Sequence, residues 1–173
     1  KNLGCYGDGG AILTNDGALA EKLKMIANHG QKLRYYHEMV GCNSRLDAIQ
    51  AAILNVKIKR LDAYNTARQK VAAAYNEAFS SHPKITIPFV APGNTHVYHQ
   101  YTLILEGVDR DALSEYLAGI GIPSMIYYPV PAHRQKMFES FGSGELNLPN
   151  TDWLTKRVIS LPMHTEMEEN QLQ

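Results

Sequence analysis

The stretch Asn43-Ser44-Arg45-Leu46-Asp47 and the apolar repeat that follows it decide the fold of this chain. From Ser44 onward, apolar side chains recur mostly at intervals of three, four or seven over roughly nine turns, with no proline or glycine before Pro83. This spacing predicts one long helix that can bend near its middle. The repeating residues are Leu46, Ile49, Ile53, Val56, Leu61, Tyr64, Val71, Tyr75 and Phe79.

The start of this helix supports two interpretations that are compatible with each other. Ser44 can serve as the N-cap, with Asp47 three residues later reaching back as in a capping box. Asn43 and Arg45 then remain free to face a ligand, and the helix N-terminus favours an anion such as a phosphate.

The N-terminal stretch before this helix is rich in glycine. Gly4, Gly7, Gly9 and Gly10 stand close to Lys1, so the backbone can approach a bound group closely. On spacing alone, a generic turn with a surface lysine is the more common explanation. After it we expect a strand at 9–14, a helix that Asp16 caps and Gly30 ends, and an exposed loop at 31–42.

Beyond Pro83 short elements alternate, which predicts an α+β layer. Tyr127-Tyr128-Pro129-Val130-Pro131 leaves the last of the central strands for a loop stiffened by proline, where side chains are both exposed and rigidly placed. Ordinary packing at a rim is an equally good explanation from the sequence. The expected elements are strands at 85–90, 97–105 and 122–128, helices at 109–119 and 151–159, and a strand end at 160–163.

Composition excludes several classes of function. Seventeen basic and seventeen acidic residues cancel, which argues against nucleic acid as a partner. No apolar stretch approaches the length of a membrane span. Cys5 and Cys42 lack ligand spacing and are expected as free thiols in a reducing cytosol. His96 and His99 point to opposite faces of a strand, so we expect no metal site.

Taken together, several ordered motifs resemble the DegT/DnrJ/EryC1/StrS family of sugar aminotransferases, and they span the chain. The nearest likeness is to the WbpE/WlbC type of UDP-3-oxo-sugar aminotransferase. The motifs are Lys1-Asn2-Leu3-Gly4, Gly7-Asp8-Gly9-Gly10-Ala11, His29-Gly30, Asn43-Ser44-Arg45-Leu46-Asp47 with Gln50-Ala51-Ala52, Tyr128-Pro129 and Leu161-Pro162.

The resemblance implies a cofactor, pyridoxal 5'-phosphate (PLP), and residues that bind it. Lys1 matches the lysine that holds PLP as a Schiff base and then moves the substrate proton, a catalytic role. Family members that dehydrate carry histidine there, so lysine favours amino transfer. Asn43 matches an asparagine that reaches the PLP phosphate of the other subunit, which implies a homodimer with shared active sites.

The resemblance also implies substrate contacts. Arg45 matches an arginine that meets a carboxylate, either of the amino-acid donor or of a uronic acid. Tyr128 matches a tyrosine that contacts the substrate. The residue before it is histidine in the WbpE/WlbC type but is Tyr127 here, and this departure leaves the exact sugar open.

The implied fold class is α/β, of the PLP-dependent aspartate aminotransferase-like (type I) fold. Residues 1–43 would end the large PLP-binding domain, 44–80 would form the long connecting helix, and 81–173 would form the small α+β C-terminal domain. The chain lacks an initial methionine and closes on what reads as the start of a helix. We therefore expect a fragment of a protein about twice as long, whose remaining cofactor contacts precede Lys1.

The implied function is transamination at C3 of a UDP-2-acetamido-3-oxo-glucuronic acid, with glutamate as donor, for lipopolysaccharide O-antigen biosynthesis in the cytoplasm. One alternative is amination at C4, or at C3 of a dTDP-linked 6-deoxysugar. Another alternative is a non-catalytic regulatory protein that binds PLP.

Overall fold

The computed structural model describes residues 1–142 and 145–172, which fall into two compact units. Lys1 and Leu3–Leu61 form the first unit, and Asn2 with Asp62 onward forms the second. Ser143, Gly144 and Gln173 of the expected C-terminal domain lie outside the described residues. The expected division into 1–43, 44–80 and 81–173 remains a proposal about the intact protein.

In the first unit, α1 (Gly17–Ala27) begins at the predicted Asp16 cap and ends at its C-cap Asn28, two residues before the predicted Gly30. The Asp16 carboxylate accepts hydrogen bonds from the backbone N–H groups of Ala18 and Leu19, at 2.9 and 3.1 Å. After the helix, the N–H of Gly30 donates to the carbonyl of Met25 at 2.7 Å. Gly30 has a φ of +75°, which a residue without a side chain adopts readily.

The predicted loop at 31–42 is wrong in part, because it contains an antiparallel hairpin of β1 (Gln31–Leu33) and β2 (Tyr36–His37). Elements of two or three residues are too short to give a sequence period. A close approach between two glycines packs this segment against the end of α1. A Cβ on Gly41 would lie 2.3 Å from the backbone nitrogen of Gly30, so only glycine fits there.

The strand expected at 9–14 does not form within the described residues. Ile12 and Leu13 are 72% and 92% exposed, so the described residues leave this apolar segment largely uncovered. Alternation of side chains specifies an extended backbone, but a strand also needs a neighbour to pair with.

The long helical repeat folds as α2 (Ala48–Lys57), a 3₁₀ turn η1 (Ile58–Arg60) and α3 (Leu61–Phe79). The predicted start at Ser44 is wrong. Asp47 is the N-cap and its side chain makes no capping hydrogen bond. Ser44 instead donates its N–H to the carbonyl of Ala27 at 2.9 Å, so backbone pairing with the end of α1 holds this segment extended.

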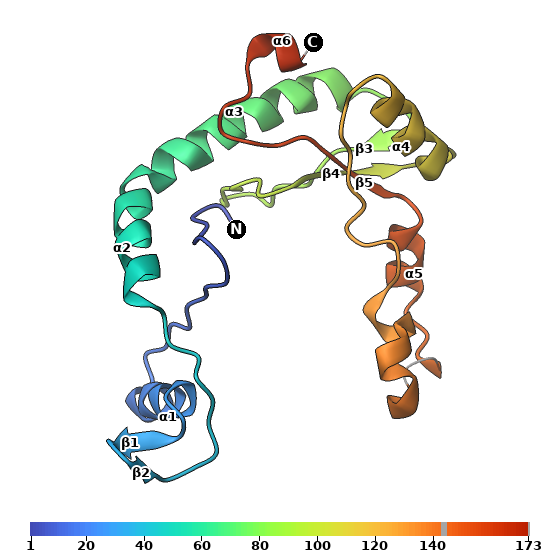
Figure 1. Ribbon diagram of the computed structural model, residues 1–173. Helices are drawn as coiled ribbons and strands as arrows, with labels where there is room; N and C mark the ends of the chain where they lie inside the picture. Colours follow the sequence, from blue (N-terminus) through green and yellow to red (C-terminus); the bar gives the residue numbers. More distant parts are fainter. Residues whose placement is uncertain (143–144, 173) are drawn as a thin grey trace. The chain divides into compact units, whose positions relative to one another are not determined.

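The second unit is built on a three-stranded antiparallel sheet, in the order β3 (Ile85–Thr86), β4 (Tyr101–Leu105) and β5 (Val158–Leu161) (Figure 1). Side chains of β4 alternate between buried and half-buried, as expected of a central strand with one face on a core. Its inward residues pack with α3 and β5, and the core comprises Val71, Ala72, Tyr75, Tyr98, Tyr101, Leu103, Leu105 and Ile159.

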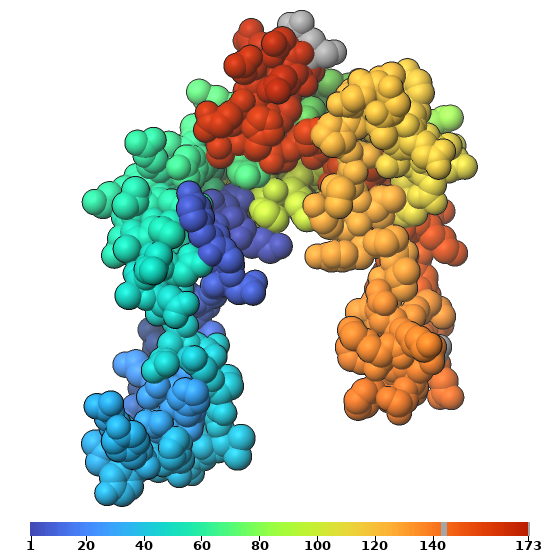
Figure 2. Space-filling model, viewed as in Figure 1, coloured from blue at the N-terminus to red at the C-terminus, as the bar shows by residue number. Residues whose placement is uncertain are grey.

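The C-terminal segment packs against this core, on the side where α3 contributes to it. Met163, Met167 and Leu172 pack against it, and Figure 2 shows residues 163–172 in red over the green helix. The Tyr75 hydroxyl donates to the carbonyl of Pro162 at 2.9 Å. Burial raises the pKa of Tyr101 to about 12, and its hydroxyl donates to the Asn76 side chain at 2.7 Å.

The predicted short elements of this unit are confirmed in part. α4 (Arg110–Gly119) matches the helix expected at 109–119, and Asp109 caps its start. The strands are shorter than predicted, and 122–128 contributes only a bridge between Met125 and Ser160. The helix expected at 151–159 is α5 (Pro149–Thr155), because Val158 and Ile159 belong to β5. A short α6 (Glu169–Leu172) forms near the C-terminus.

Candidate functional site

Lys1 stands at the head of the glycine-rich loop in the first unit, and its side chain is exposed. Within residues 1–142 and 145–172 its amine has no hydrogen bond or ion pair. An exposed amine without a partner is free to react with a carbonyl compound.

The loop after Lys1 is sharply turned. Gly4 and Gly7 have φ values of +58° and +106°. The Cys5 thiol donates to the carbonyl of Gly7 at 2.8 Å, and a Cβ on Gly9 would lie 2.6 Å from the Cys5 sulfur. The glycines therefore serve the turn itself as well as any approach to a ligand.

Two side chains of α2 bind this loop. Gln50 pairs with both backbone groups of Tyr6, and Lys57 donates to the carbonyl of Gly4. From the sequence, Gln50 belonged to one of the family motifs but had no assigned role, and Lys57 was not singled out. Their spacing of seven residues on a helix is the signal that could have found them.

Asn43 and Arg45 contact each other in the first unit. Arg45 donates through Nε to the Asn43 side-chain oxygen at 3.1 Å and through Nη1 to that of Asn28 at 3.2 Å. Within the described part of the chain, three guanidinium N–H groups and the Asn43 amide N–H₂ are left for a ligand. Asn43 precedes the N-cap Asp47 by four residues, so the expected help from the helix N-terminus does not apply.

A cavity of about 860 Å³ lies beside this pair within the first unit. Residues 8–12, one face of α1 and the segment 42–46 line it, and Asn43 and Arg45 are among its walls. The predicted anion-binding residues thus border a space large enough for a small ligand.

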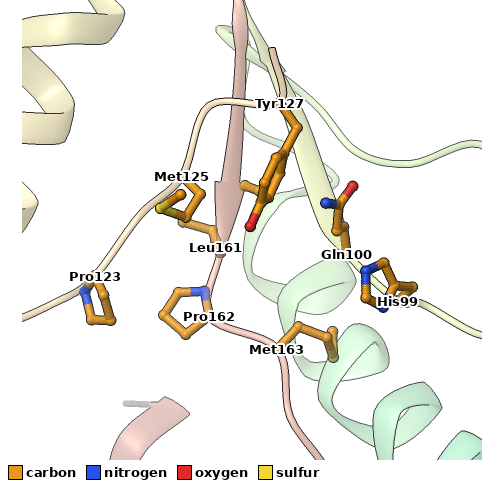
Figure 3. Close-up of a pocket in the computed structure, with 9 residues that line it drawn as sticks. His99, Gln100, Pro123, Met125, Tyr127, Leu161, Pro162 and Met163 are labelled. Carbon is orange, nitrogen blue, oxygen red and sulfur yellow. The ribbon is translucent and has the colours of Figure 1, made fainter. Parts of the chain in front are cut away.

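In the second unit, Tyr127 lines a pocket of about 240 Å³ (Figure 3). The side chains of His99, Gln100, Met125 and Pro162 line it with Tyr127. Most of its lining residues are apolar, and His99, Gln100 and Tyr127 supply polar groups.

Tyr128 is 66% exposed and does not line this pocket. Its ring meets that of Tyr127 edge to face, with centroids 5.7 Å apart. The structure therefore gives the two tyrosines different surroundings, although the sequence treats them as one pair.

Arg68 fixes one rim of the Tyr127 pocket. From α3 its Nη1 donates to the carbonyls of Tyr98, His99 and Met163, at 3.1 to 3.2 Å. Burial lowers the pKa of its guanidinium. Sequence reasoning missed Arg68, since a helical arginine gives no signal of the distant carbonyls it joins.

The loop after Tyr127 is held to α5 by an ion pair that the sequence also missed. Arg134 donates Nε and Nη2 to the two carboxylate oxygens of Asp152, at 3.0 and 2.8 Å. The buried His133 places Nε2 3.5 Å from the same carboxylate. The hydrogen bond from Arg134 is the main cause that lowers the pKa of Asp152.

The predicted site residues are therefore divided. Lys1, Asn43 and Arg45 belong to the first unit, and Tyr127 and Tyr128 to the second. Cys5 and Cys42 are free. No cluster of metal ligands and no helix able to cross a membrane occurs among the described residues.

Comparison with known sequences gives a match over residues 1–173 to the DegT/DnrJ/EryC1/StrS aminotransferase family. The chain is 46% identical to a pleiotropic regulatory protein of Geobacillus stearothermophilus, covering 100% of this chain and 46% of that protein. It is 40% identical to a dTDP-3-amino-3,4,6-trideoxy-alpha-D-glucose transaminase of Streptomyces venezuelae, covering 99% of this chain and 45% of that protein. It is 42% identical to a UDP-2-acetamido-2-deoxy-3-oxo-D-glucuronate aminotransferase of Pseudomonas aeruginosa, covering 97% of this chain and 45% of that protein. The chain thus spans about half the length of these relatives.

Solved structures confirm the aminotransferase fold, which is mixed α/β and corresponds to the C-terminal part of sugar aminotransferases. DesV of S. venezuelae, in complex with a ketimine intermediate, has a TM-score of 0.92 and 40% identity, with 99% of this chain and 46% of that chain covered. NtdA of Bacillus subtilis, with bound cofactor PMP, has a TM-score of 0.88 and 26% identity, with 99% of this chain and 41% of that chain covered.

Proposed function

Because the chain belongs to the DegT/DnrJ/EryC1/StrS aminotransferase family, we propose that the intact natural protein is a PLP-dependent transaminase acting on a nucleotide-linked keto sugar. The observation that carries the proposal is Lys1, whose amine is exposed and without a partner within the described residues. A lysine in this state suits covalent attachment of an aldehyde.

The residues present fit PLP. Lys1 would hold it covalently, and Asn43 would donate its amide N–H₂ to the phosphate because Arg45 already occupies the amide oxygen. When bound, PLP supplies an electron sink that makes the C–H bond of the amino-acid donor acidic. Lys1, released from the attachment, would use its Nζ to move the proton from the donor carbon to the cofactor carbon, and in the second half-reaction from the cofactor carbon to the sugar carbon.

As substrate we propose a UDP-2-acetamido-3-oxo-glucuronic acid aminated at C3, with glutamate as donor. Two observations support this proposal. Arg45 lines a cavity and has N–H groups available to pair with a carboxylate. The chain also resembles the UDP-2-acetamido-2-deoxy-3-oxo-D-glucuronate aminotransferase of P. aeruginosa. Tyr127 and Tyr128 would contact the sugar. The dTDP-sugar relative supports the alternative of a 6-deoxysugar, and amination at C4 stays open.

We further propose a homodimer in which Asn43 serves the cofactor of the other subunit. Use of the amino sugar in lipopolysaccharide O-antigen would follow from the proposed substrate. A cytoplasmic location agrees with the free thiols of Cys5 and Cys42.

A second candidate is a regulatory protein that binds PLP without catalysis, which the 46% identity to the G. stearothermophilus regulatory protein favours. The cofactor-binding residues proposed here would serve both functions. An assay of amino transfer distinguishes the two candidate functions. A regulatory protein would bind PLP but would not exchange an amino group between glutamate and any keto sugar.

The test is replacement of Lys1 by alanine in the intact natural protein. We expect Lys1→Ala to abolish the covalent PLP that borohydride traps, because no other amine would be placed to attach it. Amino transfer should fall on the order of 10²- to 10⁴-fold, as for loss of a general base. Mass spectrometry of the reduced protein and a coupled glutamate assay measure the two effects.

Lys59→Ala is the matched control, since Lys59 is exposed on η1 and is not part of the loop. It should leave both readouts unchanged. Reduced cofactor found on a lysine other than Lys1 would show that the assignment is incorrect.

A further inference from the structure

The loop after Lys1 is bound by two side chains of α2, and we propose that Gln50 and Lys57 are positioning residues that set the place of the Lys1 amine. The inference rests on the proposed function, because it gives these residues a part in cofactor attachment. Neither residue touches the proposed cofactor; both act through the loop backbone.

Gln50 holds one end of the loop. Its side-chain oxygen accepts from the N–H of Tyr6 at 2.9 Å, and its Nε2 donates to the carbonyl of Tyr6. A carboxamide that pairs with both backbone groups of one residue restrains that residue much as a neighbouring strand would. Gln50 is half-buried and Tyr6 is 71% exposed, so the two bonds lie at the surface of the unit.

Lys57 holds the other end. Its Nζ donates to the carbonyl of Gly4 and lies 5.4 Å from the centroid of the Tyr6 ring. Gln50 and Lys57 are seven residues apart, so both project from one face of α2. The helix therefore binds the loop at two points, on either side of Cys5.

The glycines of the loop match these contacts. A Cβ on Gly4 would lie 3.2 Å from the Lys57 amine, and a Cβ on Gly7 would lie 3.3 Å from Nε2 of Gln50. Both glycines also have positive φ values. Glycine at these two positions thus lets the loop turn and lets both side chains of α2 approach it.

Gly4 also lies near the backbone of Lys1. The same Cβ position on Gly4 is 3.2 Å from the carbonyl oxygen of Lys1, so Gly4 lies between Lys1 and Lys57. Loosening either anchor would let the Lys1 backbone move. Small misplacements of a reacting group can reduce a rate about a hundredfold.

The experiment measures the anchor and its consequence separately, in the intact protein. Hydrogen exchange of the Tyr6 amide in cofactor-free protein reports the anchor. The rate constant for covalent attachment of added PLP, trapped by borohydride, reports the position of Lys1. We expect Gln50→Met and Lys57→Met to speed the exchange and to slow the attachment about ten- to a hundredfold.

Three further variants control the result. Lys57→Arg keeps a donor for Gly4 and a cation for the Tyr6 ring, and should restore attachment. Asn55→Leu and Lys59→Met change exposed residues of the same helical stretch and should leave both readouts at the wild-type values. If Gln50→Met does not fold, the comparison of Lys57→Met with Lys57→Arg carries the test.

Unchanged exchange in the two methionine variants would show that no anchor exists. Faster exchange with unchanged attachment would reduce Gln50 and Lys57 to a structural role and overturn the inference. Wild-type protein that attaches no PLP at Lys1 would contradict the proposed function instead, and the exchange data would still show whether the loop is bound.

Discussion

Arg45 is the residue on which the choice between a uronic acid and a neutral sugar depends. It is held by Asn43 and Asn28 and, counting partners among the residues that the structure describes, retains three N–H groups for a ligand. Only a planar guanidinium can pair with both oxygens of a carboxylate, and lysine cannot replace that geometry.

We therefore expect Arg45→Lys to impair UDP-3-oxo uronic acids more than matched 6-hydroxymethyl sugars. A charged hydrogen bond contributes about 1.5 to 3 kcal/mol, so the selectivity ratio should change about ten- to a hundredfold. The measurement is kcat/KM for the matched sugars in wild type and variant.

Comparing two sugars in one variant cancels any loss that arises because Asn43 is no longer held. Equal losses on both sugars would mean that Arg45 serves the amino-acid donor, and the uronic acid proposal would lose its structural support.

Among the elements, the attachment of the 3₁₀ turn η2 (Ala132–Arg134) to α5 depends on one carboxylate. Asp152 has its pKa lowered from 3.8, chiefly by the hydrogen bond from Arg134. A lowered folded-state pKa contributes stability above the unfolded value, and this stability is lost as the pH falls through the folded value.

We accordingly expect Asp152→Asn to lower the Tm of the protein at neutral pH, and the difference from wild type to shrink as the pH falls below 3.8. Thermal unfolding followed across this pH range measures it. Glu115→Gln is the matched control, because Glu115 is exposed on α4 and has no ion pair among those described. A Tm difference that is constant with pH would mean that the carboxylate charge does not hold the turn.

At the scale of the whole molecule, the first unit leaves large apolar side chains uncovered. Ile12, Leu13 and Val40 are exposed by 72%, 92% and 96%. We expect these side chains to be covered in the intact protein. A homodimer with an isologous interface would place some of them against the partner.

Mixing two inactive variants tests whether the active sites are shared. If Asn43 serves the other subunit, a dimer of one Lys1→Ala chain and one Asn43→Ala chain has one doubly damaged site and one intact site. We expect activity to return to about a quarter of wild type at equal mixing, since half of the dimers are mixed. Subunit exchange is verified by mass, and exchange without recovery would contradict the crossed arrangement.

The sequence alone determined the features that depend on near neighbours in the chain. The Asp16 cap and the long helical repeat were predicted because caps and periodicity act over a few residues. The ordered motifs also led to the aminotransferase fold, which the family match over residues 1–173 and the solved structures support.

Tertiary structure alone decided the features that join distant residues. Ser44 lost its cap role because its N–H pairs with Ala27. Arg68 meets carbonyls as distant in sequence as Met163, and Lys57 meets Gly4. A hydrogen bond that crosses the fold leaves no local pattern, because its geometry exists only once the intervening chain has packed.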